Sequence, residues 1–184
     1  MKTAFLLHGT GGSSKDYFWF ADTKKFLQKL GYEVWWPQLP HTDSPNFQET
    51  LEFVEDNMPA SDAQTIVIAH SSACPLILSW LQYVKMSIKQ AILVAGYYEP
   101  MPDGASSLLQ KEEFDWQAIK LACKEIIMIN SDNDPWGCDD KQARPTAKKL
   151  YAQFILASGQ GHMGSGAFKQ PYRKFTLLKD LIAV

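Results

Sequence analysis

The chain has 184 residues, of which 46% are hydrophobic and 21% charged, a composition typical of one globular domain over residues 1–184. The formal net charge of -2 offers no basic surface to nucleic acid or an anionic membrane, and no apolar run approaches the length that spans a bilayer. The three cysteines are widely spaced without a CxxC motif, so we expect free thiols in a reducing compartment, the cytoplasm by default.

Strand-like and helix-like segments alternate along the chain. In chain order we expect a strand at 3–9, a helix at 22–30, a strand at 32–40, a helix at 47–58, a strand at 65–70, a helix at 72–84, a strand at 90–98, a helix at 116–122, a strand at 125–131, a helix within 134–150, a strand at 151–158 and a closing helix over 168–184. Pro145 interrupts or begins the helix within 134–150, and residues 99–116 read as mostly irregular. Six apolar strands separated by helices predict a three-layer α/β/α sandwich around a mostly parallel six-stranded sheet.

Polar residues gather where these strands end, at the edge where such sheets carry their chemistry. The first strand runs into His8 and a glycine loop, and the third into the sequence His-Ser-Ser at 70–72. The fifth strand is followed by Asp132 and Asp134, and the sixth by His162. Serine, acid and histidine therefore occur in the chain order of one class of serine hydrolases.

Each residue type has a chemical reason to be there. A serine hydroxyl becomes nucleophilic when an imidazole takes its proton, and a carboxylate orients and stabilises that imidazole. The oxyanion formed by the attack needs two N–H donors, one from the residue after the nucleophile and one from a loop after the first strand. These requirements predict Ser72 and Thr10 as oxyanion donors.

These motifs resemble the α/β-hydrolases, and in particular the small hydrolases of the retinoblastoma-binding protein 9 family, which have no large lid. The resemblance rests on the glycine loop, "AHSSAC", "LVAGYY", "SDNDPW" and "GQGH", and so covers nearly the whole chain. It implies a minimal α/β-hydrolase fold with Ser71 as nucleophile, Asp134 as acid and His162 as base. In this family the nucleophile lies in a sharp turn, the nucleophile elbow, with the pattern G-x-S-x-G. Alanine replaces glycine at both ends of this pattern, at 69 and 73, and we expect this to be tolerated with a slightly adjusted turn.

Other interpretations compete at several of these positions. Ser71 and Ser72 could each simply cap the following helix, and Asp132 rivals Asp134 as the acid. "GTGGSSKD" at 9–16 resembles a phosphate-binding loop but lacks its final glycine and its Ser/Thr, so an oxyanion loop explains the glycines better. For His8 and His70 we expect packing and hydrogen-bonding roles.

The resulting hypothesis is a serine hydrolase that cleaves small carboxylic esters, thioesters or amides through an acyl-enzyme, without a cofactor or a metal. Trp19, Tyr97 and Trp136 are the predicted pocket walls, and the short 99–116 segment predicts an open, shallow pocket. We expect a small-molecule partner, no nucleic acid or membrane partner, and a monomer or homodimer. The alternative is a catalytically degenerate binding protein on the same fold.

Overall fold

A computed structural model of the protein describes residues 2–101 and 107–183. Residues 102–106, part of the segment expected to be irregular, and Val184 of the closing helix lie outside the described residues. The strands are β1 (Lys2–Leu7), β2 (Tyr32–Trp35), β3 (Ile66–His70), β4 (Ile88–Val94), β5 (Cys123–Asn130) and β6 (Gln153–Leu156). The helices are α1 (Phe20–Lys29), α2 (Phe47–Asn57), α3 (Ala73–Leu81), α4 (Trp116–Ala122), α5 (Asp140–Leu150) and α6 (Thr176–Ala183).

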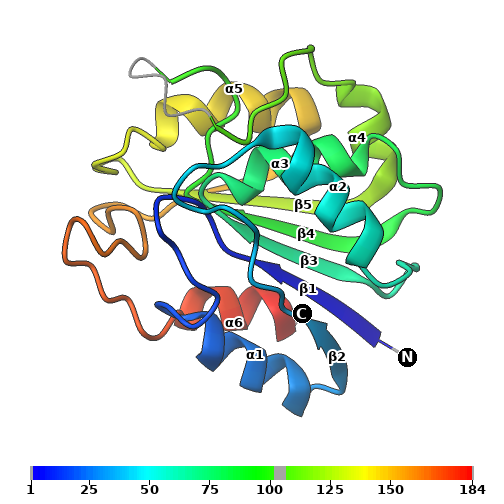
Figure 1. Ribbon diagram of the computed structural model, residues 1–184, viewed down its shortest axis with the longest axis horizontal. Coiled ribbons are helices and arrows are strands. Elements are labelled where there is room, and N and C mark those ends of the chain that lie inside the picture. Colours follow the sequence, from blue (N-terminus) through cyan, green and yellow to red (C-terminus); the bar gives the residue numbers. More distant parts are fainter. Residues whose placement is uncertain (1, 102–106, 184) are drawn as a thin grey trace.

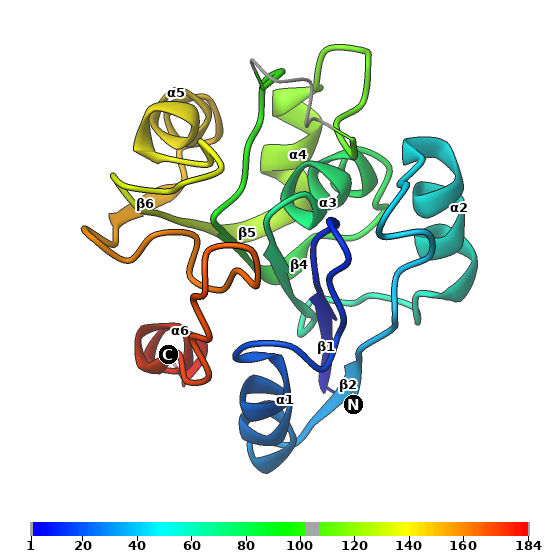
Figure 2. The same ribbon diagram turned by 60° about the vertical axis from the view of Figure 1, so that its left-hand side comes forward.

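The strands form one sheet in the order β2-β1-β3-β4-β5-β6, and each neighbouring pair is parallel. Helices α1 and α6 cover one face, and α2 to α5 cover the other, as Figures 1 and 2 show. All five residues of β3 are buried, because the centre of a parallel sheet is covered on both faces. The predicted three-layer α/β/α architecture is confirmed.

The element boundaries differ from the expected ones mainly near turns. Pro145 lies inside α5 and neither breaks nor begins it, and Asp139 caps this helix by accepting from two of its N–H groups. The closing helix begins at Thr176 and not at 168, because Gln170 pairs with Ser165 through two backbone hydrogen bonds and holds this part of the chain in a turn. In the described part of the chain, no helix is both long and apolar enough to cross a membrane.

The carboxyl ends of the strands meet at one edge of the sheet. In register, Leu7 of β1 pairs with Ala69, and His70 at the end of β3 pairs with Val94. Asn130, the last residue of β5, pairs with Leu156 of β6. The loops that follow these strands therefore converge at this edge, where the polar residues were expected to gather.

Candidate active site

Ser71 occupies a sharp turn between β3 and α3. Its φ of 56° is left-handed, a conformation that is uncommon for a residue with a side chain and is found at strained functional turns. The turn is held by the Ser71 N–H, which donates to the Val94 carbonyl at 2.9 Å, while Ala69 and Ala73 are fully buried on either side. The elbow geometry thus forms with alanine at both flanking positions.

The glycine loop after β1 packs directly against this turn. A Cβ on Gly9 would lie 2.8 Å from the Ser71 Cβ and 3.3 Å from the His70 carbonyl oxygen, so only glycine fits without displacement. The N–H groups of Gly11 and Gly12 both point to the carbonyl of Thr42, at 2.8 and 3.4 Å. They are therefore not free to bind a phosphate, which removes the basis of the phosphate-loop interpretation.

His162 and Asp134 form a short, buried hydrogen bond. The Nδ1 of His162 lies 2.7 Å from Asp134 Oδ2, and their side chains are 6% and 0% exposed. The second carboxylate oxygen accepts from the Trp136 N–H at 2.8 Å, which fixes the carboxylate plane. Because a carboxylate bonded to Nδ1 leaves Nε2 as the ring's remaining basic nitrogen, this arrangement suits a general base.

Asp132, the rival acid, is turned away from His162. Its carboxylate accepts from Ser158 Oγ at 2.5 Å and from the Gly159 N–H at 2.8 Å. The hydrogen bond from Ser158 is the main reason that the pKa of Asp132 is lowered. Asp132 thus ties together the loops after β5 and β6.

Two further contacts fix the backbone of His162. Its N–H donates to Gln170 Oε1 at 2.9 Å, and its carbonyl accepts from Nε2 of His70, also at 2.9 Å. Since a carbonyl only accepts, Nε2 of His70 carries the proton. Burial, with a smaller contribution from the charge of His162, lowers the pKa of His70 to about 3, so His70 is neutral.

The expected packing role of His8 is also seen. Its Nε2 accepts from the Leu39 N–H at 3.0 Å, and its Nδ1 donates to the Gly9 carbonyl at 2.8 Å. Burial lowers the pKa of His8, which keeps it neutral and able to accept that bond. His8 joins the loops after β1 and β2.

The two expected oxyanion donors are in contact with each other. The Thr10 N–H donates to Ser72 Oγ at 2.9 Å, and Thr10 Oγ1 lies 2.9 Å from the same oxygen. The hydroxyl of Ser72 therefore occupies the Thr10 N–H, which was expected to face the substrate. The Ser72 N–H has no acceptor among the described residues. Ser72 precedes α3, but its side chain makes no capping bond, since its backbone is helical and not extended as in most N-cap residues.

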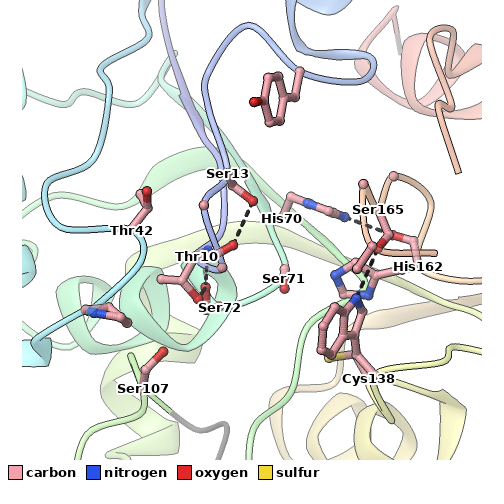
Figure 3. Close-up of a pocket in the computed structure, with 18 of the residues that line it drawn as sticks. Thr10, Ser13, Thr42, His70, Ser71, Ser72, Ser107, Cys138, His162 and Ser165 are labelled. Atoms are coloured by element: carbon pink, nitrogen blue, oxygen red, sulfur yellow. Dashed lines mark hydrogen bonds between the residues drawn. The ribbon is translucent and has the colours of Figure 1, made fainter. Parts of the chain in front are cut away.

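A pocket of about 320 Å³ lies among these loops, and Figure 3 shows its lining. Ser71, His162 and the predicted walls Tyr97 and Trp136 line it. The prediction for Trp19 is wrong: Trp19 does not line this pocket, is fully buried, and donates from Nε1 to the Met163 carbonyl at 2.8 Å. Its position after a glycine loop in the sequence could not separate a core residue from a wall.

Ser71 Oγ and the His162 ring share this pocket without a hydrogen bond between them among the described residues. Such contacts are often long in ligand-free enzymes and shorten when substrate binds. The arrangement provides a hydroxyl on a strained turn, a carboxylate-oriented imidazole and an unpaired N–H beside it. These are the groups that acyl transfer by a serine nucleophile requires.

Sequence reasoning missed two contributors to this site, Gln170 and Cys138, and it expected a hydrogen-bonding role for His70 without identifying the His162 carbonyl as its partner. Cys138 lines the pocket, and together with Asp134 and His162 it offers three potential metal-ligand atoms within 4.8 Å of one another. No sequence spacing reveals this set, because His162 comes from a different loop. The only feature of the sequence that pointed to this set is that Cys138 follows Asp134 by four positions, in "DNDPWGC".

Comparison with known proteins gives consistent results. A family model described as Serine hydrolase matches residues 4–179. The rat serine hydrolase RBBP9 is 25% identical over 92% of this chain and 91% of its own length, and the Bacillus subtilis protein YdeN is 27% identical over 72% of this chain and 71% of its own. The crystal structure of the B. subtilis ydeN gene product superposes with a TM-score of 0.90 at 22% identity, covering 100% of this chain and 97% of that one. An esterase from Pyrococcus furiosus shares the fold with a TM-score of 0.62 at 14% identity, covering 99% and 81%.

Proposed function

The chain belongs to the serine hydrolase family, and on this basis we propose that it hydrolyses small carboxylic esters through an acyl-enzyme formed on Ser71. Its α/β-hydrolase fold and its family make it a hydrolase. Ser71, Asp134 and His162 are the proposed catalytic residues. The proposal also includes thioesters and small amides, which react through the same tetrahedral intermediate.

The observation that carries the proposal is the 2.7 Å contact between His162 Nδ1 and Asp134 Oδ2, beside a serine at a φ of 56°. The hydroxyl of Ser71 attacks the substrate carbonyl while Nε2 of His162 takes its proton. Asp134 stabilises the imidazolium, which then protonates the leaving alcohol. Water, activated by the same imidazole, attacks the acyl-enzyme and releases the acid.

In this mechanism the tetrahedral oxyanion is held by N–H groups beside Ser71. The N–H of Ser72 is unpaired among the described residues and lies at the start of α3, where the helix dipole favours negative charge. The Thr10 N–H becomes available once the Ser72 hydroxyl turns away from it. The substrate carbonyl therefore displaces this internal hydrogen bond as it binds.

The walls of the pocket support a small substrate with an apolar part. Tyr97 is 3% exposed, and burial raises its pKa to about 12, so it is neutral and presents an aromatic surface. Trp136 is 43% exposed and lies between the pocket and solvent. We also place the protein in the cytoplasm, because none of Cys74, Cys123 and Cys138 forms a disulfide.

The test compares the wild type with Ser71→Ala and Ser72→Ala in fluorophosphonate labelling and in hydrolysis of short p-nitrophenyl esters. We expect labelling of the wild type and of Ser72→Ala but not of Ser71→Ala, with ester turnover reduced about a million-fold in Ser71→Ala. The Ser72 variant is the matched control, because it removes a neighbouring hydroxyl from the same pocket. A folded wild type that neither labels nor turns over ester would favour the binding protein.

A further inference from the structure

Cys138 lies beside the His162–Asp134 pair and takes no part in the proposed chemistry. One ligand atom each from Asp134, Cys138 and His162 lie within 4.8 Å of one another. Figure 3 shows Cys138 next to His162 at one side of the pocket. The pocket reaches both residues, so a small solute can approach them.

Rigid backbone presents these three groups. Asp134 and Cys138 come from the loop between β5 and α5, where the Cys138 carbonyl accepts from Asn130 Nδ2 at 2.8 Å and the Gly137 N–H donates to the Asp134 carbonyl at 3.1 Å. His162 comes from the loop after β6, which Gln170 and His70 fix on either side. The three residues are 8%, 3% and 5% exposed, so little ordering is needed to bring the ligand atoms together.

The set of donor atoms selects a class of cation. A thiolate, an imidazole nitrogen and a carboxylate oxygen suit Zn²⁺ and the softer Cd²⁺, whereas Mg²⁺ requires six oxygen ligands in octahedral geometry. Three protein ligands leave a fourth tetrahedral position for a water molecule or another small ligand. We propose that Asp134, Cys138 and His162 form an inhibitory binding site for Zn²⁺ or Cd²⁺.

Binding balances as a simple exchange of a proton for a metal ion. The Cys138 S–H bond breaks, its proton passes to solvent, and the sulfur binds the cation as a thiolate. If His162 binds through Nε2, the nitrogen that takes the Ser71 proton is occupied. If it binds through Nδ1, its contact with Asp134 is lost and its proton resides on Nε2. Either geometry stops the proposed proton transfer.

Inhibition rests on the proposed function, whereas binding of the cation does not. The first measurement is therefore the ultraviolet absorption of the full-length protein titrated with Cd²⁺, since a cadmium–thiolate bond gives a charge-transfer band. We expect the band in the wild type and in Cys123→Ala, but not in Cys138→Ala or Cys138→Ser. Cys123 is the matched control because it begins β5, whereas the site follows the carboxyl end of that strand. Loss of the band in Cys123→Ala with retention in both Cys138 variants would overturn the assignment.

The second measurement is ester hydrolysis with added Zn²⁺, each variant being compared with its own metal-free rate. We expect Zn²⁺ but not Mg²⁺ to inhibit the wild type, a chelator to restore activity, and the inhibition constant to rise about 10- to 100-fold or more in the Cys138 variants. Equal inhibition of the wild type and both Cys138 variants, or no cadmium band in the wild type, would refute the site. A band without any metal-free ester turnover would support the site and count against the proposed function.

Discussion

Replacing Gly9 with alanine tests whether the close packing of the glycine loop sets the position of the nucleophile. Gly9 does not have a left-handed φ, so the backbone itself tolerates alanine. The added Cβ, however, would lie 2.8 Å from the Ser71 Cβ and 3.2 Å from Ser72 Oγ. The substitution therefore perturbs space at the elbow and little else.

The size of the effect follows from these distances. Carbon atoms in contact prefer separations of about 3.5 Å or more, so the loop and the elbow must move apart by roughly 0.7 Å. Overpacking of this kind costs about 1–3 kcal/mol of unfolding free energy. A misplacement approaching about 1 Å at a reacting group costs up to about 100-fold in rate. We expect Gly9→Ala to stay folded at 25 °C with ester turnover reduced about 10- to 100-fold.

Urea denaturation and ester hydrolysis, measured on the same preparations, separate these two effects. Gly166→Ala is the matched control for stability, because a Cβ there meets nothing within 4 Å and its φ is not left-handed. Its unfolding free energy should remain within about 0.5 kcal/mol of the wild type. Wild-type turnover in Gly9→Ala would refute the reasoning, since the elbow would then have absorbed the methyl group without moving Ser71.

Three further predictions concern neighbouring polar groups. Asp134→Asn should lower kcat by about 10⁴, whereas Asp132→Asn should leave kcat near that of the wild type, and equal losses in steady-state kinetics would contradict the assignment. His70→Phe should remove a pH dependence of stability, because the unfolded chain protonates this histidine below pH 6.5 and the folded chain only near pH 3. The unfolding free energy of the wild type should therefore fall by about 1.4 kcal/mol per pH unit as the pH drops through this window. Urea midpoints measured at pH 7 and pH 5 should show this fall in the wild type and a smaller one in His70→Phe. Ser72→Ala frees the Thr10 N–H and should raise kcat/KM about 2- to 10-fold; a decrease would show that the hydroxyl assists turnover.

Much of the fold could be predicted because its signals are local. The buried run at 65–70 is apolar on both faces, which indicates a central parallel strand. Gly31 and Pro59 each mark the end of a helix, because glycine and proline disfavour its continuation. The closing helix was predicted to begin too early, because the backbone pairing of Gln170 with Ser165 forms a local turn that the apolar pattern does not record.

The sequence by itself determined which residue types follow each strand, and hence the candidates Ser71, Asp132 or Asp134, and His162, since chain order and strand ends can be read from local patterns. Only the tertiary structure decided between alternatives that share a loop. Asp132 and Asp134 are two residues apart, and only packing shows that one faces Ser158 and the other His162. The same holds for Trp19, buried in the core, and for Cys138, which lies beside a histidine 24 positions later in the chain. The physical reason is that side-chain direction in a loop depends on long-range contacts, which sequence periodicity does not encode.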